Sequence, residues 1–545
     1  MKKIVANISV LAISTLMLVG CSDFLEREPY GQSTKWKTES DVDKAIFALY
    51  DYSSANWAEE ICGRGHMWLE CVSDNVLIGR DRAEVEEMRR FNMAPSNGQD
   101  CKFMWKVMYE NNAKANNIIL LVPQMAGLSQ SYKNKAVGTA YFFRGFSMMW
   151  IVPYYGDNGP NGGIPIITDK TEAVNMDAPR PKSVLDNYDQ IISDMRQAGE
   201  LLPLFSELKA DSEYGLPHKA AAWAYAARAA LYAAQYNAKY YDIVIEMCDK
   251  IMGLSGADKR ELYDDGTANA FANLWTTKNN YCKEYLFSIA GDANHGAKYY
   301  GVTFVNGGWG IYNTWGYFTP SLELYNAYEQ GDARRDATIL APGQHVQFVG
   351  NDVQFGGFCQ DGSISSWKTG HATCGLVVRK FIAPFAASDA PGKDISPLRD
   401  KCYTSLNVSL MRYAEVVLMK AEALIWSKGE GNAEAKALLN SLRKRAGLPQ
   451  NSAATKAQLQ NERRCELAFE FQPSRFVDVI RWGKGTEWLN PAAHSVASYK
   501  ENNVIKMRPI EVYPARSYRE GVSQVFPIPA RAFNGTVNLK QNQGY

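Results

Sequence analysis

The sequence predicts a mostly α-helical protein, in which tetratricopeptide-like helical hairpins form a scaffold and a loop-rich segment is inserted between them. Apolar residues recur at steps of three and four over much of the chain, which is the period of an amphipathic helix. Between about residues 255 and 405 this period is replaced by a texture rich in Gly, Asn, Asp, Ser and aromatic residues. Long helical runs, a repeated hairpin plan and this one interruption together favour the helical class.

The expected helices can be placed from their apolar period and from the prolines near their ends. Pro153, Pro203 and Pro217 lie where helices should end or begin, because proline cannot continue a helix. The expected helices cover residues 41–52, 103–122, 132–152, 184–202, 220–235, 240–252, 410–428, 433–446 and 456–471. Residues 496–545 show no such period, and we expect them to be irregular.

Two segments share one hairpin plan. Residues 219–252 carry alanines at four-residue steps and then a second amphipathic helix, and residues 413–446 repeat this plan around a Gly-Glu-Gly turn. Both have roughly the 34-residue period of tetratricopeptide repeats, in which small residues let antiparallel helices approach closely. The alternative is generic pairing of helices without a true repeat.

The N-terminus is typical of a lipoprotein export signal. Lys2 and Lys3 precede a mostly apolar run that ends in Gly20-Cys21. This ending resembles the bacterial lipobox, in which the cysteine is acylated and becomes the mature N-terminus. The apolar run is too short to be a good spanning helix. We therefore expect lipidation of Cys21, palmitate included, and a protein anchored to a membrane outside the cytoplasm; the alternative is an ordinary signal peptide with a chance cysteine.

Charge and cysteine content exclude several classes of protein. The formal net charge is +1, and it becomes −1 once Lys2 and Lys3 are removed with the signal. Nucleic-acid binding needs a basic face, so this balance argues against it. The ten cysteines include Cys21 and are scattered without C-x-x-C spacing, so neither a zinc ribbon nor a dense disulfide framework is encoded.

The composition predicts an order of parts along the chain. Loops carried on a rigid scaffold are where binding residues tend to lie, so the insertion is the expected ligand-binding part. The predicted parts are a signal peptide at 1–20, a lipid-anchored tether at 21–40, an N-terminal helical region at 41–255, the insertion at 256–409 and a C-terminal helical region with an irregular tail at 410–545.

The sequence lacks the common signatures of catalysis. It has no H-E-x-x-H, no G-x-S-x-G, no P-loop and no Rossmann glycine fingerprint. Cys62, His66, Glu70 and Cys71 could share a helix face and bind a metal, but nearby glycines weaken that helix and favour plain packing. Residues 157–163 offer oxygen ligands without the bidentate Glu of a calcium loop, which favours a plain turn. We therefore expect no catalytic residue, no metal and no cofactor.

The aromatic, Gly-rich stretch 306–318 is the best candidate for ligand binding. Indole and phenol faces stack on the C–H faces of sugar rings, and asparagine side chains can hydrogen-bond to sugar hydroxyls. The alternative is a buried aromatic cluster that pins the insertion to the scaffold. A loop at 74–100 is a weaker candidate, because exposed charges are usually just solvated. The candidate contacts are Trp309, Tyr312, Trp315, Asn306, Asn313, Asp74, Arg82 and Asn97.

Short motifs are distributed over the whole mature chain. They are CSDFL (21–25), AYFFRGF (140–146), YYG (154–156), GIPI (163–166), RYAEV (412–416), ERRCELAFE (462–470), RFVD (475–478), FPIP (526–529) and QNQGY (541–545). Together they resemble the SusD/RagB family of nutrient-uptake lipoproteins of the Bacteroidetes outer membrane. Gln543 stands where that family usually has a proline, which is a small departure.

The resemblance implies a SusD-like fold displayed at the cell exterior by the lipid on Cys21. It implies, as partner, a SusC-like TonB-dependent outer-membrane transporter that the protein covers as a lid. It implies no reaction and assigns no binding residue. The oligosaccharide or polysaccharide ligand is our own hypothesis, which the aromatic stretch suggests. The charged motif residues are expected to form ion pairs between packed helices, with Tyr413 and Trp482 filling the seam; they are Glu415, Glu422, Glu462, Glu466, Arg463, Arg475 and Asp478.

These expectations lead to one main functional hypothesis and three alternatives. The main hypothesis is a surface glycan-binding lipoprotein that delivers oligosaccharides to the transporter. The first alternative keeps the lid role but captures peptides, as the RagB branch suggests. The second is a tetratricopeptide scaffold that binds only a partner protein. A hydrolase comes last, and we expect no enzyme.

Overall fold

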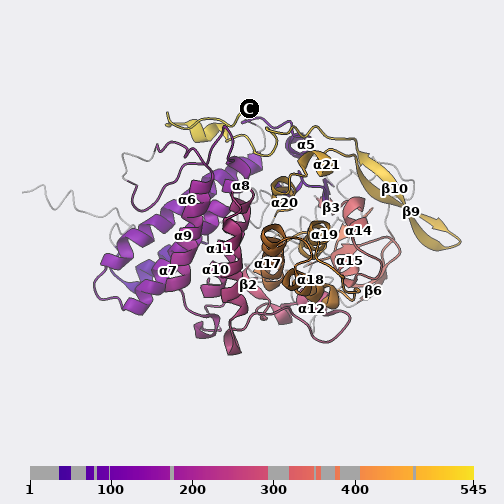
Figure 1. The fold of residues 1–545 in the computed structure, drawn as a ribbon, viewed down its shortest axis with the longest axis horizontal. Helices are drawn as coiled ribbons and strands as arrows, with labels where there is room; N and C mark the ends of the chain where they lie inside the picture. The colour runs from indigo at the N-terminus through magenta and orange to yellow at the C-terminus, as the bar shows by residue number, and fades with distance from the viewer. Residues whose placement is uncertain are drawn as a thin grey trace, which may run out of the picture.

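The computed structural model shows a body of packed helices with short two-stranded sheets, and a long β-hairpin extends from one side (Figure 1). One continuous hydrophobic cluster is formed by buried residues that are spread along the chain from Val42 to Ile528. The structure describes residues 36–50, 69–78, 83–96, 99–171, 177–210, 212–291, 318–348, 351–356, 375–380, 405–470 and 474–545.

Helices dominate both halves of the chain, and every helix expected from the apolar period is present. The earlier helices are α3 (Glu39–Ala48), α5 (Ala83–Arg89), α6 (Gln99–Leu121), α7 (Gln130–Met149), α8 (Val152–Tyr155), α9 (Leu185–Leu201), α10 (Lys219–Ala234) and α11 (Tyr240–Met252). The later helices are α12 (Ala270–Leu274), α14 (Leu322–Ala327), α15 (Ala333–Thr338), α17 (Tyr413–Lys428), α18 (Ala433–Arg445), α19 (Lys456–Leu467), α20 (Arg475–Arg481) and α21 (Gly485–Leu489). Short 3-10 turns lie at Val122–Gln124, Phe205–Glu207, Gly256–Asp258, Thr277–Asn279 and Ala530–Phe533.

The long helices pack side by side in a row that forms the scaffold. Along this row α6 contacts α7, α7 contacts α9, α9 contacts α10, and α10 contacts α11. The row continues through α17, which contacts both α11 and α18, and Figure 1 shows this progression across the molecule. The two predicted hairpins are therefore α10–α11 and α17–α18, and they pack against each other through α11 and α17.

Alanines allow α10 to lie at the centre of this row. Eight of its positions from Ala220 to Ala230 are alanines, and all of them are at most 2% exposed. A methyl side chain keeps the helix surface close to its axis, so α7, α9, α11 and α17 can all contact α10. The hairpin turn after α17 has a separate cause: Gly429 and Gly431 adopt φ values of 100° and 85°, which favour glycine.

The strands form five two-stranded antiparallel sheets among the described residues. The strands of these pairs are β1 (Val76–Ile78) with β3 (Phe318–Pro320), β2 (Tyr285–Ile289) with β8 (Val408–Arg412), β4 (Ile339–Leu340) with β7 (Val377–Val378), β5 (His345–Phe348) with β6 (Asn351–Gln354), and β9 (Ala493–Glu501) with β10 (Val504–Tyr513). None of these sheets could be stable alone, so each depends on the helices that it packs against.

The sequence-based expectations were wrong at three places. The helix expected from residue 410 begins only at Tyr413, because the preceding residues are the fully buried strand β8. The helix expected to reach residue 471 ends at Leu467, and Phe469 then takes a positive φ of 61°. The tail expected to be irregular contains the hairpin β9–β10, whose turn has Asn502 and Asn503 at φ 52° and 62°. Asparagine is enriched in such left-handed turns, so this signal was present but weak.

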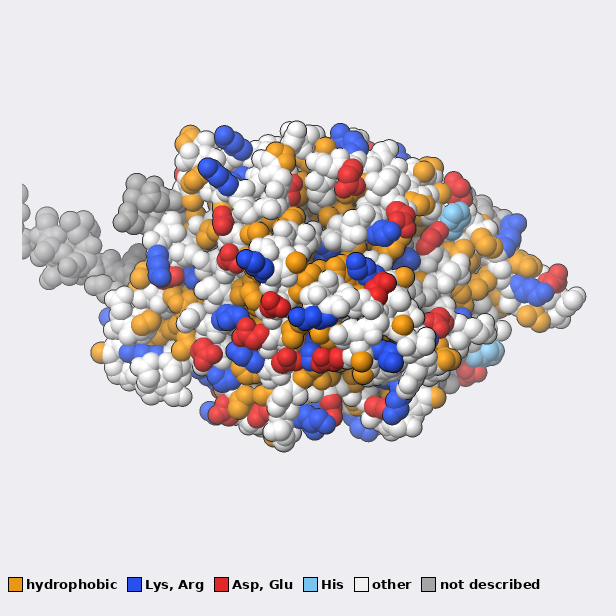
Figure 2. Space-filling model, viewed as in Figure 1, with side chains coloured by type: hydrophobic (Ala, Val, Ile, Leu, Met, Phe, Trp, Pro, Cys, Tyr) orange, Lys and Arg blue, Asp and Glu red, His pale blue; other side chains and the backbone are white. Residues whose placement is uncertain are grey.

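The face of the molecule drawn in Figure 2 has no extended patch of a single charge sign. Figure 2 shows Lys and Arg side chains interspersed with Asp and Glu over the face, as expected from a formal net charge of +1. None of the helices in the described part of the chain has the length and apolar character needed to span a membrane.

His218 makes the stability of the fold depend on pH. Its side chain lies before α10, is 3% exposed and packs edge-on against Phe205. Burial, reinforced by the nearby Arg260 guanidinium, lowers the pKa of His218 from 6.5 to about 3. Below pH 6.5 the unfolded chain therefore binds a proton that the folded protein does not. The folded state should lose about 1.4 kcal/mol of stability per pH unit between pH 6.5 and 3 through this group.

Urea unfolding of wild type and His218→Gln at several pH values between 7 and 4 measures this contribution. We expect the variant to show the shallower loss of stability as the pH falls. His345→Gln is the matched control, because the His345 side chain is 62% exposed. Equal slopes for wild type and His218→Gln would contradict the assignment.

Candidate functional site

The two candidate ligand-binding segments meet at the sheet formed by β1 and β3. Ile78, the last residue of β1, pairs with Phe318, the first residue of β3. Because the strands are antiparallel, the chain leaves β1 toward residues 79–82 at the same end of the sheet at which it arrives from residues 306–317. All six residues of the two strands are buried. The sheet therefore holds the ends of both segments next to each other.

Hydrogen bonds at both ends of this sheet, and a cation–π contact behind one of them, fix it in place. At its inner end, the Ser321 hydroxyl donates to the Asp74 carbonyl at 2.7 Å and its amide donates to the Asn75 carbonyl at 2.9 Å. At its outer end, the Tyr513 hydroxyl of β10 donates to the Ile78 carbonyl at 3.0 Å. The guanidinium of Arg89 in α5 lies 3.7 Å from the centre of the Tyr513 ring. The candidate segments thus start from a rigid base.

Asp74 is the one predicted contact that the structure describes. Its carboxylate accepts from Arg475 Nε at 2.8 Å and lies 3.1 Å from Arg464 NH2. Burial alone would raise the pKa of Asp74, but the two guanidinium groups hold it well below its usual range. Asp74 is thus a permanently charged anchor that joins β1 to α19 and α20. A direct contact between Asp74 and ligand stays a prediction.

The other predicted residues lie outside the described part of the chain. This holds for the lipidation site and for seven candidate contacts, which are Cys21, Arg82, Asn97, Asn306, Trp309, Tyr312, Asn313 and Trp315. Their roles stay predictions. The structure gives the position of described residues next to the candidate contacts, such as Ile78 and Phe318.

Buried ion pairs support the scaffold behind the candidate site, as the motifs predicted. Glu415 of α17 pairs with Arg228 of α10 and lies 3.5 Å from Arg463 of α19. Arg463 also donates to Asp478 of α20 at 2.7 Å. Each of these four side chains is at most 5% exposed, so the pairs join four helices inside the core. Glu422 forms a similar link, because it accepts from Trp482 at 2.9 Å and pairs with Arg481.

A second ionic cluster is centred on Glu466. Its carboxylate pairs with Arg445, Arg412 and Arg334, with 2.9 Å to Arg412 and 3.1 Å to Arg334. Burial alone would raise the pKa of the Glu466 carboxyl, but these cations hold that pKa well below its usual range. An acid that is locked in its charged form cannot exchange protons near neutral pH. Glu466 is therefore an ionic link between these arginines and is not suited to act as a general acid or base.

The turn at residues 157–163 binds the C-terminal tail. Asp157 accepts from the amide of Gly159 at 2.8 Å and from the side chain of Asn161 at 2.7 Å. Asn161 in turn accepts from the amide of Gln543 at 2.6 Å. This geometry agrees with a plain turn. Within the described residues no group of three or more His, Cys, Asp or Glu side chains is placed to hold a metal ion. Cys62 and His66, the other half of the weak metal candidate, lie outside these residues.

The structure thus defines a scaffold of helical hairpins with an inserted loop region based on one small sheet. Residues 283–545 match the family described as the SusD family, and residues 23–231 match a family described as starch-binding and associating with the outer membrane. The two matches together cover most of the chain. The chain belongs to the SusD family.

Relatives and solved structures agree with this assignment. A SusD-like protein, P2, from Formosa agariphila is 28% identical over an alignment of 520 residues, and the match covers 87% of this chain and 90% of that protein. A solved SusD-like protein from Bacteroides fragilis has a TM-score of 0.75 at 24% identity, with 95% of this chain and 99% of that chain covered. Surface glycan-binding protein A from Bacteroides thetaiotaomicron, solved with laminarihexaose, has a TM-score of 0.68 at 17% identity, with 92% and 99% covered. The predicted mostly α, SusD-like fold is confirmed.

Proposed function

We propose that the protein is a surface glycan-binding lipoprotein that captures oligosaccharides and delivers them to a SusC-like TonB-dependent outer-membrane transporter. The observation that carries this proposal is the pairing of Ile78 with Phe318, which gives residues 79–82 and 306–317 a common base. A binding site assembled from two segments can surround a sugar on more than one side. The names of the solved neighbours, which include a laminarin-binding SusD-like protein, support a glycan as the ligand.

The contacts with the sugar are proposed to come from the aromatic stretch. Trp309, Tyr312 and Trp315 would stack on sugar rings, and Asn306 and Asn313 would bind hydroxyl groups. Arg82 and Asn97 would complete the site from the other segment, next to the anchored Asp74. Such a shallow, hydrated site would bind individual chains with Kd values of roughly micromolar to millimolar.

The cellular setting follows from the N-terminus and from the family. Cys21 would carry the acyl chains that hold the protein on the outer membrane, facing the exterior. The description of the matching family, which mentions association with the outer membrane, supports this location. A binding protein without catalysis agrees with the ionic clusters, in which buried acids such as Glu415 and Glu466 are paired with arginines.

Replacing Trp309 or Trp315 with alanine tests the site. We expect each change to weaken binding to the cognate glycan by about tenfold, or 1.4 kcal/mol, because a stacking face is lost. Affinity electrophoresis in gels that contain starch or laminarin identifies the glycan, and calorimetry with the matching oligosaccharide gives Kd. Both measurements use the chain that starts at Ser22, which lacks Cys21 and therefore carries no lipid.

The matched control is Trp426→Ala, which removes a half-buried tryptophan from α17 of the scaffold. It should leave Kd unchanged. Unchanged binding in both Trp309→Ala and Trp315→Ala would place the site elsewhere. Binding of peptides without any glycan would favour the peptide-capturing alternative, and turnover of the glycan during the measurement would contradict the assignment as a binding protein.

A further inference from the structure

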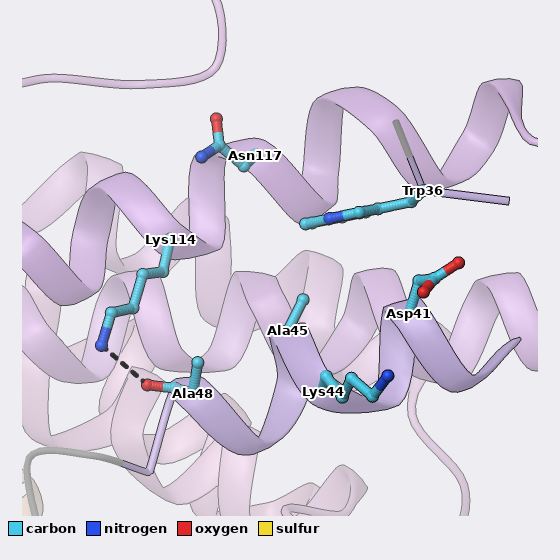
Figure 3. A pocket seen from close by; sticks show the side chains of 7 residues that line it. All are labelled: Trp36, Asp41, Lys44, Ala45, Ala48, Lys114 and Asn117. Atoms are coloured by element: carbon cyan, nitrogen blue, oxygen red, sulfur yellow. Dashed lines mark hydrogen bonds between the residues drawn. The ribbon is translucent and has the colours of Figure 1, made fainter. Parts of the chain in front are cut away.

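A groove of about 410 Å³ lies between α3 and α6 (Figure 3). In Figure 1, α6 lies on the opposite side of the molecule from β3. Side chains of both helices, together with Trp36 just before α3, line the groove. The groove is lined by Trp36, Asp41, Lys44, Ala45, Ala48, Lys114 and Asn117. It therefore combines a large aromatic surface, a floor of small residues and a polar rim.

Trp36 forms one wall of the groove and Ala45 lies opposite it. In Figure 3 the indole lies flat along the opening, and the Ala45 methyl group is across from it on α3. Trp36 is half-buried and packs against the hydrophobic core, which holds the ring in place. A capping box fixes the backbone just after it, because the Thr38 hydroxyl accepts from the Asp41 amide. The aromatic wall is thus preorganised.

The polar rim offers both hydrogen-bond donors and acceptors. Asp41 uses Oδ2 for its bonds with Lys37 and Thr38, at 2.9 to 3.0 Å, so Oδ1 is the oxygen that can accept from a ligand hydroxyl. Lys44 and Asn117 are exposed, one on each helix. At the other end Lys114 donates to the Ala48 carbonyl at 3.0 Å, drawn as the dashed line in Figure 3, and closes the groove.

We propose that this groove is a second saccharide-binding site, which takes a neutral pyranose ring between Trp36 and Ala45. A sugar ring has an apolar C–H face that matches an indole, and equatorial hydroxyls that match carboxylate, amide and ammonium groups at the edge. Asp41 and Lys44 bring opposite charges to the rim, and the ammonium group of Lys114 is already bonded to the Ala48 carbonyl, so the free polar groups of the rim suit a neutral ligand with hydroxyl groups. The side chains of Ala45 and Ala48 are small, so no bulky group stands on the floor of the groove.

This second site is separate from the proposed site at the β1–β3 sheet. Its residues are Trp36, which precedes α3, and side chains of α3 and α6, whereas the other site is based on β1 and β3. A glycan long enough to contact both places, or two chains bound at once, would be held more tightly than either site alone allows. The second site can be tested whether or not the first one binds the same sugar.

Fluorine NMR on protein labelled with 5-fluorotryptophan tests this proposal directly. The Trp36→Phe variant identifies the Trp36 signal among those of the 13 tryptophans. Laminarihexaose and maltohexaose are the probes, added to the chain that begins at Ser22. We expect the Trp36 signal to shift and saturate with a Kd on the order of 1 mM, as for a shallow site. The same shift should occur in the double variant Trp309→Ala, Trp315→Ala.

Filling the groove gives an independent check that leaves Trp36 in place. Ala45→Leu should block the ring and weaken the response of the Trp36 signal at least tenfold. Ala433→Leu, on an exposed alanine at the start of α18, is the matched control and should leave it unchanged. The proposal is overturned if neither sugar shifts the Trp36 signal in wild type, or if Ala45→Leu responds like wild type. A shift that disappears in the double variant would also overturn it, because the response would then originate at the first site.

Discussion

Replacing Arg412 with alanine is expected to lower the free energy of unfolding by about 3–5 kcal/mol, the range for breaking a buried ion pair from one side. The Arg412 side chain is fully buried and lies among three carboxylates. It donates to Glu470 at 2.6 and 2.8 Å, lies 2.9 Å from Glu466, and also pairs with Glu284. Arg445, Arg334 and Lys380 would still pair with these acids, but the three carboxylates would lose the one cation that contacts all of them. The excess buried negative charge would have to be met by proton uptake or by water, and both cost stability.

Urea unfolding followed by circular dichroism measures the effect of Arg412→Ala. The matched control is Arg196→Ala, which breaks a pair with Glu246 in which both side chains are 43% exposed. We expect that control to lose less than about 1 kcal/mol, because water already screens the pair. Arg412→Lys keeps the charge but loses the bidentate geometry, so it should fall between the two. Equal losses for Arg412→Ala and Arg196→Ala would show that the cluster does not stabilise the fold.

Replacing Phe142 with alanine is expected to cost about 3–5 kcal/mol, the usual range for removing a fully buried phenylalanine. Phe142 lies at the centre of an aromatic cluster that joins α7 to α10 and β2. Its ring centre is 5.6 Å from that of Phe143, 5.4 Å from Tyr225 and 4.8 Å from Phe287, all in edge-to-face contact. Alanine would leave a cavity that these rigid rings cannot close.

The melting temperature and the urea midpoint of Phe142→Ala measure this loss. Phe47→Ala is the matched control, since Phe47 is 68% exposed and its removal should change stability by less than about 0.5 kcal/mol. Phe142→Leu retains most of the volume and should show a smaller loss than alanine. A Phe142→Ala protein as stable as the control would mean that the core refills around the missing ring.

The helical scaffold could be predicted from sequence because its signals are local. The apolar period indicates where helices lie, and the alanines of α10 and the glycines after α17 indicate a close-packed hairpin and its turn. Strand β8 was missed because a local pattern is also the only signal that it offers. Its five buried residues form a short apolar run that continues directly into α17, and periodicity cannot separate such a strand from a helix.

The ionic clusters were predictable only in part. The motif residues Glu415, Arg463 and Asp478 were expected to pair, and they do. Partners outside the motifs carry no sequence signal. Arg228, which pairs with Glu415, comes from α10, and Glu284, which pairs with Arg412, is the residue before β2. Asp74 was selected as a loop charge, whereas the structure pairs it with Arg464 and Arg475. An isolated acidic residue looks the same in sequence whether it is solvated or paired.

The helical class, the hairpins, the family and the aromatic stretch that is proposed to bind sugar could be predicted, because each depends on residues that are close together along the chain. Only the folded protein shows that Ile78 pairs with Phe318, and that Trp36 faces Ala45 across a groove. These pairs are brought together by packing of distant elements. Their closeness follows from the shape of the core, which no local pattern specifies.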